Sequence, residues 1–338
     1  MKALPADIVE LGAINWLPRG KSRRSRIVAP AMLLAAVLSA GGSVARAQWN
    51  TEITPSQVFQ QTRRIISKIR RLRVAQGATD IPRNPAVQAH KYPIHVYAKC
   101  LEVLEKVTRF EADLGLSPGA LGQIPIARVR PAEVFNCTQD VLHELDRISG
   151  AVGLAPSDER FPLLPGKAPA DVYRNMWRAS FLLDGVVGQV SPSYVYRNTQ
   201  YILSELDLIA ATLGVHLAGR APEPQPDRMP VDVNLQGFMV LYVLASIERA
   251  LGIAPLVVGD FPPGSIQPSD VYDTTGTIMA ELVRIKAKLG ITAQRATLAV
   301  LESTDPPHVH AQMVLIRKRA QTLRASLQAT VPRPPVTQ

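Results

Sequence analysis

One structural unit recurs eight times along most of this chain. In each copy a proline is followed three residues later by a valine, and in most copies an aromatic residue comes directly after the valine. The eight valines are Val58, Val96, Val134, Val172, Val195, Val233, Val271 and Val309. Successive valines are 38 residues apart, except for the fourth and fifth, which are 23 apart. A constant period of this length indicates a fold assembled from repeated units.

Each unit has the pattern of a single amphipathic helix. Proline is favoured at the first position of a helix, where its missing N–H costs no hydrogen bond. Apolar residues recur 7, 11, 14 and 18 positions after the valine, as at Ile202, Leu206, Ile209 and Leu213, and these steps of three and four define one helical face. Six units carry glycine 19 positions after the valine, which is typical of a helix end. The repeat therefore predicts eight helices of about 21 residues.

The short junction between the fourth and fifth units divides the repeats into two sets of four. Residues 48–190 and residues 191–330 correspond to each other with an offset of 137 positions. Four amphipathic helices, each with one apolar face, can enclose a core as a four-helix bundle. We therefore expect an all-α fold of two tandem four-helix bundles, followed by a proline-rich tail at residues 331–338. The alternative is one α-solenoid of stacked helix pairs.

The direction of the helices decides whether the two cysteines, Cys100 and Cys137, can form a disulfide. Both lie near the start of successive predicted helices, so the up-and-down order that is usual for bundles places them at opposite ends, about 20 Å or more apart. A disulfide requires Cα atoms within about 7 Å, and this order therefore predicts two free thiols. The connecting segments are long enough to return the full helix length in extended form. A disulfide would require either parallel helices, the less expected order, or a crosslink between two chains.

Residues 1–47 have the pattern of an export signal. A basic region with Ser22-Arg23-Arg24 precedes an apolar stretch at 27–41, and Ala45-Arg46-Ala47 stands before Gln48. This order predicts cleavage between Ala47 and Gln48 and a periplasmic or secreted protein. The double arginine resembles the start of a twin-arginine signal, and general secretory export is the alternative route. A retained membrane anchor is a further alternative, for which the apolar stretch is short.

The charge of the chain is concentrated at its N-terminus and in two helices. The formal net charge is +10, but the predicted signal contains seven basic and two acidic residues, so cleavage leaves +5. A charge this modest does not favour a nucleic-acid partner, and after cleavage no further segment is expected to span a membrane. The first and eighth helices are basic and either face solvent or contact an anionic partner. Their cations are Arg63, Arg64, Lys68, Arg70, Arg71 and Arg73 in the first, and Arg317, Lys318, Arg319 and Arg324 in the eighth.

The sequence contains no recognisable catalytic or cofactor motif. It lacks the HExxH pattern of zinc hydrolases, the CxxCH pattern of haem attachment and a P-loop. His308 and His310 resemble a metal-binding pair, but the repeat places His308 at the third helical position and His310 at the aromatic position. His95 also occupies the third position of its unit. No catalytic residue, metal site or cofactor is therefore predicted.

The segment Val-Tyr-Arg-Asn occurs twice, once in each of the units that flank the short junction, and forms the candidate ligand site. Arginine near a helix N-terminus opposes the helix dipole by about 0.3–1 kcal/mol. A carboxylate or phosphate ligand would offset that cost, with the tyrosines as flat walls. Alternatively, the arginines pair with loop acids such as Asp158 and Glu159. The candidate residues are Tyr173, Arg174, Asn175, Tyr196, Arg197 and Asn198.

Taken together, these features predict an exported, non-catalytic helical-repeat protein of the periplasm. Its expected partner is an anionic ligand, a polymer of the cell envelope or another envelope protein. The alternative is an exported enzyme, or a helical bundle that binds a cofactor or metal, delivered by the twin-arginine route.

Overall fold

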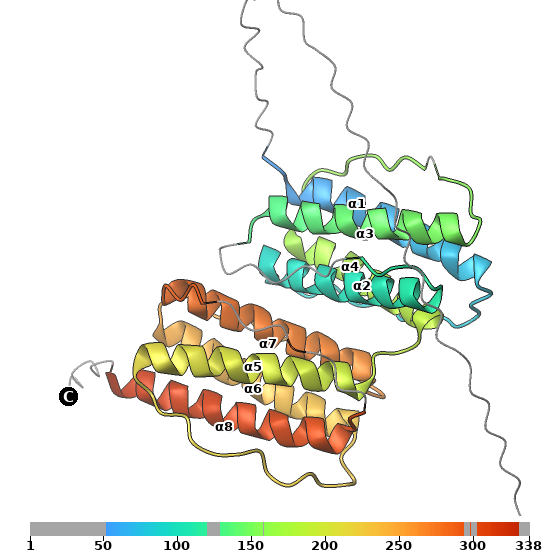
Figure 1. Ribbon diagram of the computed structural model, residues 1–338. Helices are drawn as coiled ribbons and strands as arrows, with labels where there is room; N and C mark the ends of the chain where they lie inside the picture. Colours follow the sequence, from blue (N-terminus) through green and yellow to red (C-terminus); the bar gives the residue numbers. More distant parts are fainter. Residues whose placement is uncertain (1–51, 120–128, 158, 294–297, 299–302, 331–338) are drawn as a thin grey trace, which may run out of the picture. The chain divides into compact units, whose positions relative to one another are not determined.

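The computed structural model describes residues 52–119, 129–157, 159–293, 298 and 303–330 (Figure 1). These residues form eight α-helices and no strand. The helices are α1 (Pro55–Ala75), α2 (Pro93–Asp113), α3 (Pro131–Ala151), α4 (Pro169–Val187), α5 (Pro192–Leu213), α6 (Pro230–Ala250), α7 (Pro268–Lys288) and α8 (Pro306–Thr330). The predicted signal at residues 1–47, its cleavage site and the proline-rich tail lie outside the described residues.

The helix ends are those that the repeat predicts. Every helix begins at the proline of its unit. The acid three positions after the N-cap accepts the N-cap N–H, as Glu133 does from Arg130 at 2.8 Å and Asp270 does from Gln267 at 2.8 Å. The six repeat glycines all have positive φ, between 66° and 73°, which only glycine adopts without strain. Local sequence signals therefore fix the start of every helix and the end of six of them.

The helices form two four-helix bundles with the same packing pattern (Figure 1). In the first bundle α1 and α2 each pack against α3 and α4, and in the second α5 and α6 each pack against α7 and α8. Helices α1 and α2 are thus diagonal partners, as are α5 and α6. Each bundle encloses its own cluster of buried apolar side chains. The predicted all-α fold of two four-helix bundles is confirmed.

The expected up-and-down order of the helices is wrong, because the helices of each bundle are parallel. The first residues of α1, α2, α3 and α4 line a single hollow of about 10 Å³, together with the repeat valines three positions later. All four N-termini therefore lie at one end. The segments between helices of one bundle, such as residues 76–92, rise about 3.3 Å per residue when extended. They can therefore return more than the ~31 Å length of a helix.

Contacts at matching heights show that the second bundle is also parallel. The Asn198 amide donates to Thr275 of α7 at 3.0 Å, and both lie in the first turns of their helices. Arg319 of α8 pairs with Asp207 of α5 at 2.8 Å, and both lie in the middle turns. In the first bundle the amide of Asn175 bonds Thr62 in the same way as Asn198 bonds Thr275.

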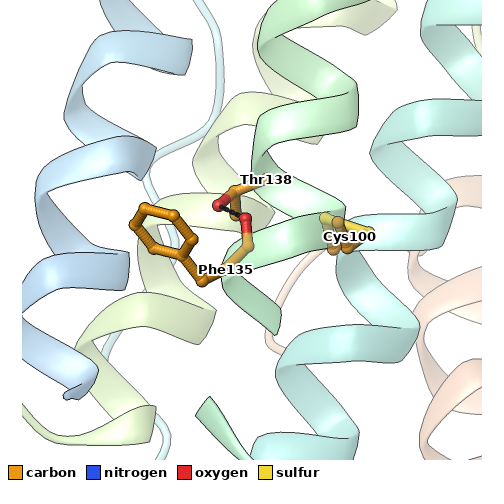
Figure 2. Close-up of a disulfide and its surroundings, with 4 residues drawn as sticks. Cys100, Phe135 and Thr138 are labelled. Carbon is orange, nitrogen blue, oxygen red and sulfur yellow. Dashed lines mark hydrogen bonds between the residues drawn. A yellow bond between two sulfur atoms is a disulfide. The ribbon is translucent and has the colours of Figure 1, made fainter. Parts of the chain in front are cut away.

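Parallel packing brings the two cysteines together, so the prediction of free thiols is wrong. Cys100 of α2 and Cys137 of α3 form a disulfide with Cα atoms 6.4 Å apart (Figure 2). Both side chains are buried in the first core. Figure 2 places the bond beside the turn of α3 in which the Thr138 hydroxyl donates to the Phe135 carbonyl at 2.7 Å. Both cysteines lie near the start of their helices, and because the helices are parallel these starts are at the same end of the bundle.

Helix α6 differs from the expectation that no segment after the signal could span a membrane. It is long and apolar enough to do so by length and composition, with a mean hydropathy of 1.4. Half of its apolar 18-residue stretch is buried inside the bundle, however, and α6 packs against both α7 and α8. The core helix of a bundle in water passes the same test.

Candidate functional site

The two Val-Tyr-Arg-Asn segments do not form one site, because they lie at opposite ends of α4. The first begins at Val172 in the first turn of α4, and the second begins at Val195 in the first turn of α5. Only residues 188–191 separate these helices, so the start of α5 adjoins the end of α4. A helix of 19 residues is about 28 Å long.

In the first copy, two of the three candidate residues have buried partners. The Tyr173 hydroxyl donates to Asp273 of α7 at 2.6 Å, and burial together with this carboxylate raises the pKa of Tyr173 well above its usual value. The Asn175 amide donates to Thr62 of α1 at 3.0 Å. Both side chains therefore hold helices together.

In the second copy, the arginine also has a protein partner. Arg197 pairs with Glu105 of α2 at 2.6 Å and is only 12% exposed. Asn198 is buried against Thr275, and the Tyr196 hydroxyl accepts from Gln312 at 3.4 Å. The expected pairing with an acid is thus found for Arg197, although the acid lies in α2 rather than in a loop.

Arg174 differs from the other candidates, because the described residues contain no acid paired with it. Glu159 instead bonds Ser67, and Asp158 lies outside the described residues. Arg174 is half-buried, as is Arg178 one turn further along α4. Spacing of four residues places these two guanidinium groups on one face of the helix.

Arg70 of α1 completes a group of three arginines, which we call the arginine seam: Arg70, Arg174 and Arg178. The contact between α1 and α4 includes Asn175 with Thr62 and Arg73 with the Leu182 carbonyl at 2.7 Å. Arg178 lies between Asn175 and Leu182 on α4, and Arg70 lies one turn before Arg73 on α1, so both are beside this contact.

The seam is electrostatically unbalanced within the part of the chain that the structure describes. Burial, followed by the positive charges of Arg70 and Arg174, lowers the pKa of the Arg178 guanidinium. No ion pair among the described residues includes a member of the seam. Three neighbouring cations without an acid form a surface that attracts anions.

The other basic residues of α1 bind within the first bundle, and two of them hold the segment between α3 and α4. Arg71 donates to the Ala155 carbonyl at 2.6 Å, and Arg63 donates to the Pro162 carbonyl at 3.5 Å. Lys68 pairs with Asp146 of α3. Between this segment and the α1–α3 groove lies a polar cavity of about 540 Å³, lined by Arg64, Ser67, Lys68, Gln139, Leu142, Asp146, Ser157, Glu159, Arg160 and Phe161.

A buried network of charges joins α2 of the first bundle to α7 of the second. Lys99 pairs with Glu102 on its own helix and with Asp273 of α7, and all three are buried. Burial alone would lower the pKa of the Lys99 ammonium, but Asp273 and Glu102 raise it above its usual value. Further along α2, Lys106 pairs with Asp184 of α4 at 2.5 Å. Lys99 therefore stays charged in a buried contact between the bundles.

His95 forms the other end of this network. Its Nδ1 accepts from the Tyr92 N–H at 2.9 Å, so its Nε2 carries the proton and donates to Glu281 of α7 at 2.5 Å. Both side chains are completely buried, and burial lowers the pKa of His95. His95 thus has the capping role expected from the repeat and a contact across the bundles that the repeat does not predict.

Within its own bundle, Glu281 also contacts a second carboxyl group, that of Glu248, and the guanidinium of Arg284. Burial and the hydrogen bond with Glu281 raise the pKa of Glu248 to about 9. Burial opposes ionisation of Glu281 as well, but its hydrogen bonds with His95 and Glu248 lower its pKa to about 2. Glu248 is therefore the protonated partner and Glu281 the ionised one. Arg284 pairs with both carboxyl groups.

The first bundle repeats this cluster at the corresponding positions of its own helices. Arg147 pairs with Glu111 at 2.8 Å and also with Glu144. In both bundles the first glutamate holds the following segment: Glu111 accepts from the Gly119 N–H at 3.0 Å, and Glu248 accepts from the Leu256 N–H at 2.7 Å. The cluster therefore anchors a connecting segment, and its carboxyl groups at Glu111, Glu248 and Glu281 are fully buried.

Sequence reasoning missed this network because charged residues usually face solvent. The available signal was complementary spacing. His95, Lys99 and Lys106 follow one another at helical intervals, and so do Asp270, Asp273 and Glu281. No group of three or more His, Cys, Asp or Glu side chains in the described residues is placed to hold a metal ion. Comparison with protein-family models, curated proteins and solved structures finds no match for this chain.

Proposed function

We propose that this is an exported, non-catalytic helical-repeat protein that binds an anionic ligand through the arginine seam. The observation that carries the proposal is the group of Arg70, Arg174 and Arg178 without an acid partner in the described residues. Guanidinium groups form forked hydrogen bonds with carboxylate and phosphate oxygens. An anion in the seam would satisfy these donors and relieve the mutual repulsion of the three charges.

The other charged groups support a binding role over a catalytic one. Glu248 and Glu281, whose pKa values are displaced in opposite directions, are buried between helices and held by Arg284 and His95. A general acid or base must reach its substrate within hydrogen-bond distance. The seam, in contrast, is open to solvent at Arg70.

Two independent features support export. The sequence of residues 1–47 has the charge, apolar stretch and small residues of a cleavable signal. The Cys100–Cys137 disulfide is typical of oxidising compartments such as the periplasm. Sequencing the N-terminus of the protein from its native compartment tests this part of the proposal, with Gln48 as the expected first residue.

Titration with polyphosphate tests the seam. Replacing Arg70, Arg174 and Arg178 together with Gln should weaken polyphosphate binding roughly tenfold or more, because each charge-assisted hydrogen bond contributes about 1.5–3 kcal/mol. Isothermal titration calorimetry measures the affinity, and circular dichroism verifies that the helices remain.

A matched variant separates a site from a general effect of charge. Replacing Arg317, Lys318 and Arg324 of α8 with Gln also removes three positive charges. This variant should keep most of the affinity. Equal losses in both variants, or no binding by the native protein, would contradict the proposed site.

A further inference from the structure

Helix α6 carries an apolar ridge on its outer face. Val231, Leu235, Met239 and Tyr242 are all exposed, by 37–60% of their surface. They follow one another at intervals of four, four and three residues, which places them on one face of the helix. Every exposed position of α6 between 231 and 242 therefore carries a large apolar side chain.

Residues outside the helix widen this ridge. The segment that follows α6 runs back along it, since Leu256 bonds Glu248 and the Phe261 ring packs on Phe238 with centroids 5.0 Å apart. Val257 and Phe261 are exposed there, and Met229 is exposed just before α6. Twelve large apolar side chains are exposed in the described residues, and seven of them belong to α6 or these flanking segments. Such concentration marks an interaction surface.

Cations outnumber acids at the edges of the ridge, where Asp260 beside Phe261 is an exposed acid. Arg249 lies two turns after Tyr242 on the same face of α6 and is exposed. Arg317 of the neighbouring α8 reaches the Met239 sulfur at 2.9 Å, and Lys318 beside it is exposed. No ion pair among the described residues includes Arg249, Arg317 or Lys318.

We propose that the α6 ridge docks on an anionic lipid surface, with its apolar side chains in the interface and its flanking cations at the headgroups. Helices with an apolar face and basic edges bind membrane surfaces in this way, and tyrosine favours the headgroup level. Charge complementarity favours lipid over a second copy of this chain, because a second copy would bring further cations to the same edges. Burial of the opposite face of α6 in the bundle argues against insertion across the bilayer.

Flotation of vesicles with the exported protein tests the proposal. The protein should float with vesicles of phosphatidylcholine and phosphatidylglycerol at low salt, and should bind vesicles of phosphatidylcholine alone much more weakly. Changing Leu235→Glu and Met239→Glu together should weaken binding to the anionic vesicles roughly tenfold or more, since burial of one such side chain is equivalent to at least a tenfold change. Both positions are exposed, so the fold should persist.

Two control variants distinguish a specific effect of the ridge from a general effect of added or removed charge. Val87→Glu with Leu163→Glu places the same charges at exposed apolar positions elsewhere and should leave vesicle binding unchanged. The arginine-seam variant should also retain it, which distinguishes this surface from the proposed anion site. Equal binding to neutral vesicles, or equal weakening in either control, would overturn the proposal. The proposal would also be overturned if alkaline extraction failed to release the bound protein. A native protein that does not bind vesicles, but forms a dimer in analytical ultracentrifugation that the ridge variant abolishes, would overturn it as well.

Discussion

The two bundles share one backbone plan but use the corresponding helices α2 and α6 in different ways. Helix α2 has no exposed position between residues 94 and 111, because α7 of the other bundle covers its outer face. The residues that it places there are polar or charged, among them His95, Lys99, Glu102 and Lys106. The same positions of α6 hold Asp232, Gln236, Met239 and Val243. The repeat thus determines the helix, while a few outward positions determine its partner.

The correspondence between the two bundles also relates the disulfide to an uncharged contact. Cys100 and Cys137 correspond to Gly237 and Thr274. A Cβ atom added at Gly237 would lie 2.6 Å from the Thr274 methyl group, so these helices are in close contact without a covalent bond. At these corresponding positions, a disulfide joins the two helices in the first bundle, and close packing joins them in the second.

The largest expected effect comes from removing a charge between the bundles. Lys99→Met would leave Asp273 buried without its ion-pair partner and Glu102 with only the more distant Lys106, at a cost of about 3–5 kcal/mol in the free energy of unfolding. Gln236→Met at the corresponding position of α6 should cost less than about 1 kcal/mol. Urea denaturation measures both. Similar values for the two variants would show that the α2–α7 contact contributes no more than the open face of α6.

The disulfide has the second largest expected effect. Cys100→Ser with Cys137→Ser should lower the free energy of unfolding by about 2–4 kcal/mol, because the unfolded chain gains freedom when this loop is opened. The native protein should lose a similar amount when it is denatured in the presence of dithiothreitol.

The serine variant is its own control, because the reductant should leave its stability unchanged. Thiol labelling of the unfolded, unreduced native protein should find no free cysteine. Two labelled cysteines would contradict the disulfide and the parallel packing that brings it together.

The helices were predictable from the sequence, but their direction was not. Proline at each start, and glycine at the end of six units, act within one turn, so local sequence determines most of the bounds. Direction depends on where the connecting segments run, and segments such as residues 76–92 are long enough for either order. The expectation for Cys100 and Cys137 failed for this reason alone. The two cysteines do share a position in the repeat, and in parallel helices that shared position brings them close together.

The candidate site was predictable only in part. Arg174 and Arg197 have the same local sequence, yet Arg197 pairs with Glu105 and Arg174 has no acid partner in the described residues. The difference comes from their neighbours, because the two copies lie at opposite ends of α4 and Arg197 at the start of α5 reaches α2 of the other bundle. Arg70 and Arg178, the other members of the seam, lie outside the repeated segment, and only the contact of α1 with α4 associates them with Arg174.

The smallest expected effect concerns pH and compares the two Arg–Glu–Glu clusters. Glu248 has a pKa of about 9 in the folded protein against 4.5 as its ordinary value. Between these values the folded state holds a proton that the unfolded state has lost, so stability falls as pH rises, by up to about 1.4 kcal/mol per pH unit. Glu281 acts in the opposite direction at low pH. Its pKa of about 2 means that its contribution is lost as pH falls from 4.5 through 2.

Glu248→Gln should therefore reduce the loss of stability between pH 6 and pH 9, as measured by urea denaturation at a series of pH values. Glu111→Gln in the first bundle should act in the same direction, since burial raises the pKa of Glu111 too. Its effect should be smaller, because the paired Arg147 is 34% exposed and Arg284 only 13%, and solvent weakens the coupling between the carboxyl groups. Equal changes of slope in the two variants would contradict the stronger coupling between carboxyl groups that we expect in the less exposed cluster of the second bundle.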